Sequence, residues 1–459
     1  MTSRRSPAAT LTVLSVAQFL IALDYSIIYI ALPSIAGELN LEPALAQWVI
    51  SAYAVLFAGF LIVGGRLADR VGAKRLFVIA IIGFGLASAV GGAADNGALL
   101  LTARGAQGFC AALLQPAILG LIGTTFPAGP SRSRALAVWG AVGASGLAAG
   151  AILGGLLTSV SWRLTFLVNV PLTLLCAAGA AIWVESARDR MHADRIPLLA
   201  SALGTGSVLA LVLGLTLGTD HGLPAVVCLG IAVALFLVFV RNEGNSRSVL
   251  IEPVLRRTVS LRIGAAATAL YMASVGSEFY LLTLLLQSQR GYTPFEAGLA
   301  FVPLAALVTV GNTAAGRVVR RLGPATVLAA GFAIAAAGLL WLSLTLDGDS
   351  YVVDLLPGLL LSGFGHGVIF TSMFIIGTQD VPHSHQGTAG ALLTTSQYLS
   401  GALTIAVLTL VLGTSAGPAA FRVAFLLTTA AALAGLALIA SRRRLAARAP
   451  LDLCEESAV

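Results

Sequence analysis

The segment Gly64-Gly65-Arg66-Leu67-Ala68-Asp69-Arg70-Val71-Gly72-Ala73-Lys74-Arg75 decides how the rest of this chain is interpreted. It contains four basic residues and one acid, and it lies between two long apolar runs. That much charge does not fit in hydrocarbon, and short loops rich in Lys and Arg are typical of the cytoplasmic side of a membrane. Each apolar run of about 20 residues then crosses the bilayer and reverses the side.

A weaker copy of this segment occurs later in the chain, at Gly316-Arg317-Val318-Val319-Arg320-Arg321-Leu322-Gly323. Gly, Arg, Arg and Gly recur at the same offsets in the two copies. Either copy alone is also compatible with an ordinary tight turn that carries cytoplasmic arginines. The recurrence favours two related halves, arranged as parallel repeats about an axis along the membrane normal.

The composition excludes a water-soluble protein. Hydrophobic residues make up 58% of the chain, charged residues 10%, and the mean hydropathy is +0.93, whereas soluble chains carry about 25% charged residues. The apolar runs are continuous, unlike the alternating segments of a membrane β-barrel. The sequence therefore predicts an all-α polytopic membrane protein in contact with the lipid bilayer.

The charges and cysteines limit the kinds of partner and site that the sequence predicts. The net charge is +7, but the basic residues lie at the ends of apolar runs, which argues against a nucleic-acid partner. The four cysteines have no regular spacing, so neither a disulfide framework nor a metal site is expected.

Fourteen membrane spans fit the chain best. Most Lys and Arg then lie on the cytoplasmic side, and the outer loops carry acids such as Glu38 and Asp347. A twelve-span alternative leaves residues 196–240 outside the membrane, although they form two apolar runs between arginine clusters. The expected spans lie near 9–34, 45–65, 76–94, 97–126, 135–159, 163–185, 196–218, 223–240, 262–287, 295–316, 323–346, 352–378, 387–413 and 420–440.

The expected domains are a six-helix bundle at 1–190, a two-helix membrane insert at 191–245, and a second six-helix bundle with a short tail at 246–459. The first span is interpreted as an uncleaved span rather than a signal peptide. Both termini are expected in the cytoplasm, and the protein is expected in the cytoplasmic membrane as a functional monomer.

Three charged residues lie inside apolar runs: Asp24 in the first, Arg104 in the fourth and Glu278 in the ninth. A charge at that depth costs about 2.5–3.5 kcal/mol on insertion scales and commonly faces a polar cavity or a partner. Asp24 and Glu278 are predicted to bind protons or a cationic substrate across a central cavity. For the two acids the alternative is a purely structural role. For Arg104 the alternative is a side chain that extends toward the membrane surface.

Other polar and aromatic residues accompany these charges. Gln115 continues a polar stripe from Arg104 along one helix face, and Tyr271 and Ser274 share the face of Glu278. His366 lies among glycines of the twelfth span, where a hydrogen-bonded structural histidine is the alternative. The substrate-binding candidates are Asp24, Tyr25, Tyr53, Gln115, Tyr271, Ser274, Glu278, His366, Phe370, Met373 and Gln397.

The fifth span contains glycines at steps of three and four, among them Gly150 and Gly154. Such a stripe permits close helix packing, and it is also a candidate pivot for moving the two halves. The sequence has no phosphate-binding loop, HExxH motif or convincing nucleophile motif. An enzyme, an ATP-driven pump or a cofactor is therefore not expected.

Taken together, these motifs resemble the major facilitator superfamily, in its fourteen-span drug–proton antiporter branch. The match includes the loop from Gly65 to Arg75, the first-span motif from Leu23 to Pro33, the fourth-span motif from Leu101 to Pro116 and the fifth-span motif from Gly140 to Gly155. Two positions depart from the pattern: Tyr29 replaces the usual asparagine, and Ala151 replaces a proline that favours a bend. Further matches are Trp162-Arg163, Phe166, Asn169, Pro171 and Gly291-Tyr292-Thr293-Pro294.

This resemblance implies alternating access, with two bundles that rock about a central site and exchange protons for a lipophilic substrate. It implies that Arg104 participates in proton transfer. It also implies that the loop residues Gly65, Asp69, Arg70, Gly72 and Lys74 latch the cytoplasmic side. The expected function is proton-coupled efflux of lipophilic, often cationic, drugs or antibiotics, with no cofactor other than the proton gradient. The alternatives are a dedicated exporter of one metabolite or antibiotic, and a membrane sensor that transports nothing.

Overall fold

The computed structural model describes residues 6–127, 130–185, 198–217, 222–245, 253–382, 386–413 and 417–452. Every regular element in these ranges is helical, which confirms the predicted all-α class. The helices form two compact units, and each unit is described separately below.

Unit 1 comprises Met1–Glu252, Phe279–Val302 and Gly401–Ala416. Its helices are α1 (Pro7–Glu38), α2 (Pro43–Ala46), α3 (Trp48–Val71), α4 (Ala73–Gly92), α5 (Gly97–Thr125), α6 (Pro130–Val160), α7 (Arg163–Leu167), α8 (Asn169–Trp183), α9 (Leu198–Leu217), α10 (Gly222–Asn245), the π-helix η1 (Leu285–Gln289) and α13 (Pro294–Ala300).

Unit 2 comprises Pro253–Glu278, Pro303–Ser400 and Gly417–Val459. It contains α11 (Pro253–Arg257), α15 (Pro324–Thr345), the π-helix η2 (Tyr351–Leu355), α16 (Leu356–Thr378) and α18 (Pro418–Asp452). Three helices contribute residues to both units: α12 (Val259–Leu284), α14 (Val302–Leu322) and α17 (Gln386–Leu412). The predicted three-domain division stays a prediction, and its boundary at 190/191 lies outside the described residues.

The predicted spans correspond to helices. Within the described ranges, thirteen helices are long and apolar enough to cross a membrane. The remaining predicted span, 135–159, falls on α6, a helix of 31 residues whose described apolar stretch is Ala149–Val160. Because α6 is continuous from Pro130 to Val160, Ala151 lies within an uninterrupted helix.

Helix starts follow the local sequence. Asn96 caps α5, since its side-chain oxygen accepts from the backbone N–H of Leu99 at 2.9 Å. Thr293 and Glu296 form a capping box at the start of α13, in which each side chain accepts from a backbone N–H of the other residue. These caps satisfy N–H groups that have no partner within the helix.

The repeated loop forms the same turn in each unit. Gly72 separates α3 from α4 with φ 93°, and Gly323 separates α14 from α15 with φ 77°. In both turns the glycine N–H donates to the carbonyl four residues earlier, Ala68 at 3.0 Å and Val319 at 2.9 Å. Positive φ is accessible to glycine without the steric cost that other residues incur. The two copies noticed in the sequence are therefore structurally equivalent.

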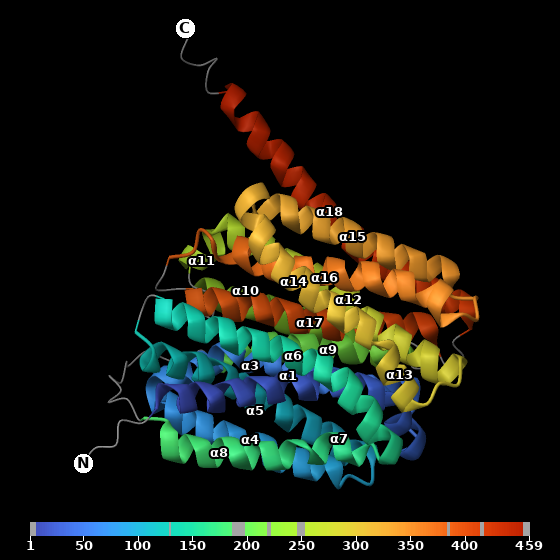
Figure 1. The fold of residues 1–459 in the computed structure, drawn as a ribbon, viewed down its shortest axis with the longest axis horizontal. Coiled ribbons are helices and arrows are strands. Elements are labelled where there is room, and N and C mark those ends of the chain that lie inside the picture. Colours follow the sequence, from blue (N-terminus) through green and yellow to red (C-terminus); the bar gives the residue numbers. More distant parts are fainter. Residues whose placement is uncertain are drawn as a thin grey trace. The chain divides into compact units, whose positions relative to one another are not determined.

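The glycine stripe of α6 packs against α1, and the two helices lie side by side in Figure 1. A Cβ atom placed on Gly146 would lie 2.7 Å from the carbonyl oxygen of Phe19, and one on Gly154 would lie 3.1 Å from that of Ile27. At Gly150 the added atom would meet the side chain of Ser26. Helix packing, the first interpretation of this stripe, accounts for all three glycines.

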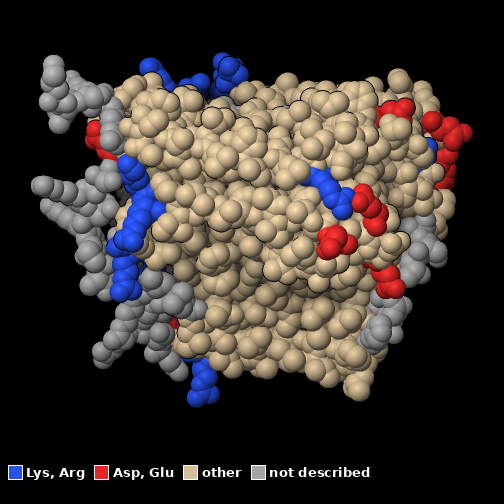
Figure 2. Space-filling view, turned by 90° about the horizontal axis from the view of Figure 1, so that it is seen from below, with Lys and Arg blue, Asp and Glu red and all other residues tan. Residues whose placement is uncertain are grey.

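The two-helix insert belongs to unit 1. Helices α9 and α10 pack against each other, and α9 packs on α3. Gln47 donates a hydrogen bond to the hydroxyl of Thr216, and Thr205 fills the space beside Gly59. α10 exposes Leu223, Val226 and Leu237, as expected for a helix that faces lipid. Most of the face shown in Figure 2 likewise carries no charge.

The contact between α6 and α1 gives a stability test. Gly146→Leu forces the helices apart or strains the core, at a cost of about 1–3 kcal/mol. We expect a lower melting temperature in detergent, measured by fluorescence-detected size exclusion after heating. Gly140→Leu is the control, because Gly140 has open space around its Cα. Equal melting temperatures for the two variants would contradict this packing.

Candidate functional site

A buried ion pair lies inside unit 1. Asp24 of α1 and Arg104 of α5 are both buried, and Nη1 of Arg104 donates to Oδ2 of Asp24 at 2.7 Å. The two side chains are 2% and 0% exposed. Removing a charge from water costs several kcal/mol per ion, so each charge here depends on the other.

Two side-chain amides complete the surroundings of Asp24. Its Oδ1 accepts from Nε2 of Gln107 at 2.9 Å and from Nδ2 of Asn169 at 2.7 Å. Gln107 also donates to Oγ of Ser88 at 2.8 Å, and its own carbonyl accepts from Arg104 at 3.0 Å. Both carboxylate oxygens are thus engaged, and the network joins α1, α4, α5 and α8.

The guanidinium of Arg104 has further contacts. Its Nε donates to the backbone carbonyl of Val49 at 2.8 Å. Its carbon Cζ lies 4.5 Å from the ring centre of Tyr53 and 5.9 Å from that of Phe166. A cation held against aromatic faces gains cation–π attraction. Arg104 is therefore a buried arginine and not one that reaches toward the membrane surface.

A second polar cluster lies inside unit 2. Oε1 of Glu278 accepts from the hydroxyl of Ser362 at 2.6 Å, and Oε2 lies 3.3 Å from Nδ1 of His366. Nε2 of His366 lies 3.1 Å from Oγ of Ser274. Glu278 and Ser274 come from α12, His366 and Ser362 come from α16, and all four are buried.

One aromatic ring contacts this cluster, and a second ring packs against the first. The ring centre of Tyr271 lies 5.9 Å from that of His366 and 5.9 Å from that of Phe370. The structure therefore brings five of the predicted substrate residues together in unit 2: Tyr271, Ser274, Glu278, His366 and Phe370.

The other candidates are distributed differently. Tyr25 shares a hydrogen bond with Tyr29 at 3.0 Å, and its ring centre lies 6.0 Å from that of Tyr53. Gln115 is partly buried on α5, and Met373 is fully buried on α16. Gln397 approaches the sulfur of Met272 at 4.0 Å. The expected cavity across the two halves, and the substrate roles, stay predictions.

One of the loop candidates, Lys74, ties α4 to α8. Lys74 donates to the backbone carbonyl of Val184 at 2.7 Å, and Val184 is the C-cap of α8. A cation at this end complements the helix dipole. Gly65 lies near Pro116, and Arg70 is exposed. The side chain of Asp69 lies outside the described part, and the latch role of the loop stays a prediction.

Trp162 and Arg163, which match the family pattern, form another set of contacts between helices. Nε1 of Trp162 donates to Oε2 of Glu38 at 2.7 Å, and Arg163 forms an ion pair with the same carboxylate. Arg163 also donates to the carbonyl of Ala94 at 3.1 Å. These contacts join the last residue of α1 to α7 and to the segment between α4 and α5.

Sequence reasoning missed the small polar partners of the two acids. Ser88 and Ser362 were not singled out, and Asn169 was noted only as part of a motif. Each is a polar residue deep in an apolar run, and that position is the one feature of the sequence that could indicate a partner for a buried acid. Serine can satisfy its hydroxyl within its own helix, so the signal is weak.

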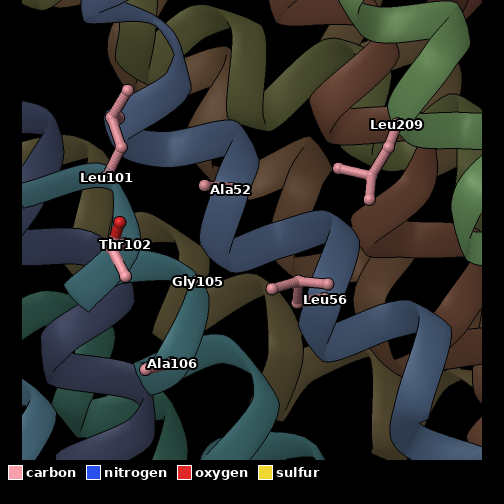
Figure 3. Close-up of a pocket in the computed structure, with 7 residues that line it drawn as sticks. All are labelled: Ala52, Leu56, Leu101, Thr102, Gly105, Ala106 and Leu209. Atoms are coloured by element: carbon pink, nitrogen blue, oxygen red, sulfur yellow. The ribbon is translucent and has the colours of Figure 1, made fainter. Parts of the chain in front are cut away.

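A hollow of about 500 Å³ opens between α3, α5 and α9 (Figure 3). Its walls are Ala52, Leu56, Leu101, Thr102, Gly105, Ala106 and Leu209. None of the predicted site residues contributes to these walls. The hollow is an apolar feature of unit 1 beside the insert.

The fold and the long apolar helices define a multi-pass helical membrane protein. The family model described as Major Facilitator Superfamily matches residues 14–405. This chain belongs to the Major Facilitator Superfamily.

Two relatives support this family membership, and one solved structure has a similar fold. The chain is 36% identical to the puromycin resistance protein pur8 of Streptomyces alboniger, over 87% of this chain and 80% of that protein. It is 36% identical to the cephamycin export protein CmcT of Amycolatopsis lactamdurans, over 91% and 88% of the two chains. The human organic anion transporter MFSD10 has a similar fold, with TM-score 0.64 and 17% identity over 95% of this chain and 99% of that one.

The pairing of Asp24 with Arg104 makes a stability prediction. Arg104→Met leaves a buried carboxylate without its cation and should lower the free energy of unfolding by about 3–5 kcal/mol. Asp24→Asn combined with Arg104→Met removes both charges and should recover much of that loss. Thermal or denaturant unfolding of the single and double variants measures the coupling. Additive losses would contradict an energetically coupled pair.

Proposed function

We propose that this protein exports lipophilic antibiotic-like molecules in exchange for protons, by alternating access between two helical bundles. The observation that carries the proposal is the likeness to relatives named for antibiotic resistance and export, over most of their length. The buried carboxyl of Glu278, beside a titratable histidine, supplies a chemically reasonable site for proton exchange.

The two acids have different roles in this proposal. Asp24 is engaged by a guanidinium and two amides, so its negative charge is already compensated by Arg104. Glu278 has no arginine or lysine in contact among the described residues, and His366 is its charged partner when protonated. We therefore assign the coupling proton to Glu278, and assign to Asp24 and Arg104 the task of holding α1 and α5 together.

The free energy of proton entry is large enough to drive export of a substrate against a gradient. One elementary charge moved through about 100 mV is worth ~2.3 kcal/mol. At ~1.4 kcal/mol for each tenfold change, exchange of one proton for one neutral substrate molecule supports a gradient of about fiftyfold; exchange for a monovalent cation moves no net charge, so the pH gradient alone drives it. The ring of Tyr271, beside His366, and the ring of Phe370, beside Tyr271, suit an apolar substrate that carries positive charge.

A dedicated exporter of one compound is the second candidate. CmcT is named for cephamycin, and a further relative, 31% identical, is the tetracenomycin C resistance and export protein of Streptomyces glaucescens. A sensor that transports nothing gains no support from these relatives.

Uptake into inverted membrane vesicles with an imposed pH gradient tests the proposal. Puromycin, ethidium and a quaternary ammonium compound are the probes. We expect gradient-driven uptake in the wild type and its loss in Glu278→Gln, because glutamine cannot carry the proton. Asp24→Asn, compared per folded molecule, should retain dependence on the gradient.

Uptake of one probe alone would favour the dedicated exporter. Gradient-driven uptake that survives in Glu278→Gln would contradict the assignment of the proton. Wild-type vesicles that accumulate no probe above empty vesicles would contradict broad export.

A further inference from the structure

The hydrogen bonds around His366 fix where its protons lie. The hydroxyl of Ser274 is 2.8 Å from the carbonyl oxygen of Tyr271, and a carbonyl can only accept. The hydroxyl of Ser274 has one hydrogen, which it donates to this carbonyl. Its oxygen therefore accepts from Nε2 of His366 at 3.1 Å. Nε2 carries a hydrogen atom.

The other ring nitrogen then faces Glu278. If Nε2 carries the only ring hydrogen, Nδ1 has a bare lone pair 3.3 Å from Oε2 of Glu278; the approach does not meet hydrogen-bond geometry, and neither atom has another partner among the described residues. A lone pair opposite an ionised carboxylate oxygen is repulsive, so this approach requires a proton on one of the two atoms. The hydroxyl of Ser362 donates to the other carboxylate oxygen and does not supply that proton.

Among the described residues, no other charged side chain is in contact with Glu278. Helices α15 and α17 have no charged residue within their bounds, and the arginines of α14 lie in its last six residues. On α16 the titratable group is His366 itself, and on α12 the neighbouring titratable group is Tyr271, whose ring contacts the imidazole. Both Glu278 and His366 have fully buried side chains. A net charge in such a place is costly, which favours a pair that is neutral as a whole.

We propose that Glu278 and His366 hold one proton jointly, and that His366 is a proton-binding residue rather than a structural histidine. The proton lies on Oε2 or on Nδ1, and Ser274 fixes the orientation of the ring. When the proton leaves for water, the pair keeps one net negative charge. That charge could then be neutralised by a cationic substrate. The assignment of this pair as the coupling site of an exporter rests on the function proposed above. The assignment of one shared proton to the pair does not.

The contrast with Asp24 supports this assignment. Both acids are buried, but Asp24 is neutralised by a guanidinium, which keeps its proton at all relevant pH values. Glu278 instead faces an imidazole, whose charge depends on whether it holds a second ring proton. Proton exchange therefore changes the charge of the Glu278 cluster without breaking an arginine ion pair.

Solid-state NMR of the full chain, ¹⁵N-labelled at histidine and reconstituted in lipid at neutral pH, tests the pair without any substrate. The His366 signals are those that disappear in His366→Gln. We expect a protonated Nε2 in the wild type, together with an Nδ1 signal that is either protonated or shifted by a hydrogen bond from the carboxyl. In Glu278→Leu, which offers Nδ1 neither a proton nor a hydrogen bond, Nδ1 should become an ordinary unprotonated nitrogen while Nε2 stays protonated.

Two serine variants complete the test. Ser274→Ala should remove the preference for a proton on Nε2. Ser277→Ala is the matched control, because Ser277 is buried on the same helix and forms no hydrogen bond with the pair. An unprotonated Nε2 in the wild type, or an Nδ1 signal that is unchanged in Glu278→Leu, would overturn the proposal. Failure of the vesicle assay with these spectra intact would instead count against export alone.

Discussion

Charge compensation inside an apolar protein is the constraint on which the rest of this structure depends. Asp24 and Arg104 come from segments 80 residues apart and meet at 2.7 Å with almost no exposure. Neither is tolerable alone at that depth, because an isolated buried charge costs more than most single interactions return. The pair therefore fixes how α1 and α5 are rotated, and the amides of Gln107 and Asn169 extend that constraint to α4 and α8.

The second buried acid obeys the same constraint with a different partner. Glu278 faces His366 rather than an arginine, and hydroxyl groups of Ser274 and Ser362 complete the cluster. A guanidinium gives a permanent positive charge, whereas an imidazole gives one that depends on its proton. One cluster is suited to holding helices together, and the other, in the function proposed above, changes its charge during transport.

Close packing accounts for the glycines. Apolar side chains gain little by leaving lipid for the interior of a helix bundle, so membrane helices associate through close contact and hydrogen bonds. The stripe of α6 brings its backbone against α1 at Gly146 and Gly154. Gly72 and Gly323 serve a different purpose, because each adopts a positive φ that joins two long helices at a sharp turn.

The sequence alone determined the membrane class, the helical spans and the repeated turn. These follow from composition and from residues adjacent in the chain, because hydropathy adds up locally and a turn needs its own glycine. It also identified Asp24, Arg104 and Glu278 as unusual. Only the tertiary structure decided which polar atoms meet. Asn169 reaches Asp24 across 145 residues, and Ser362 reaches Glu278 across 84. Those partners depend on the rotation and depth of each helix, which packing sets and local sequence does not encode.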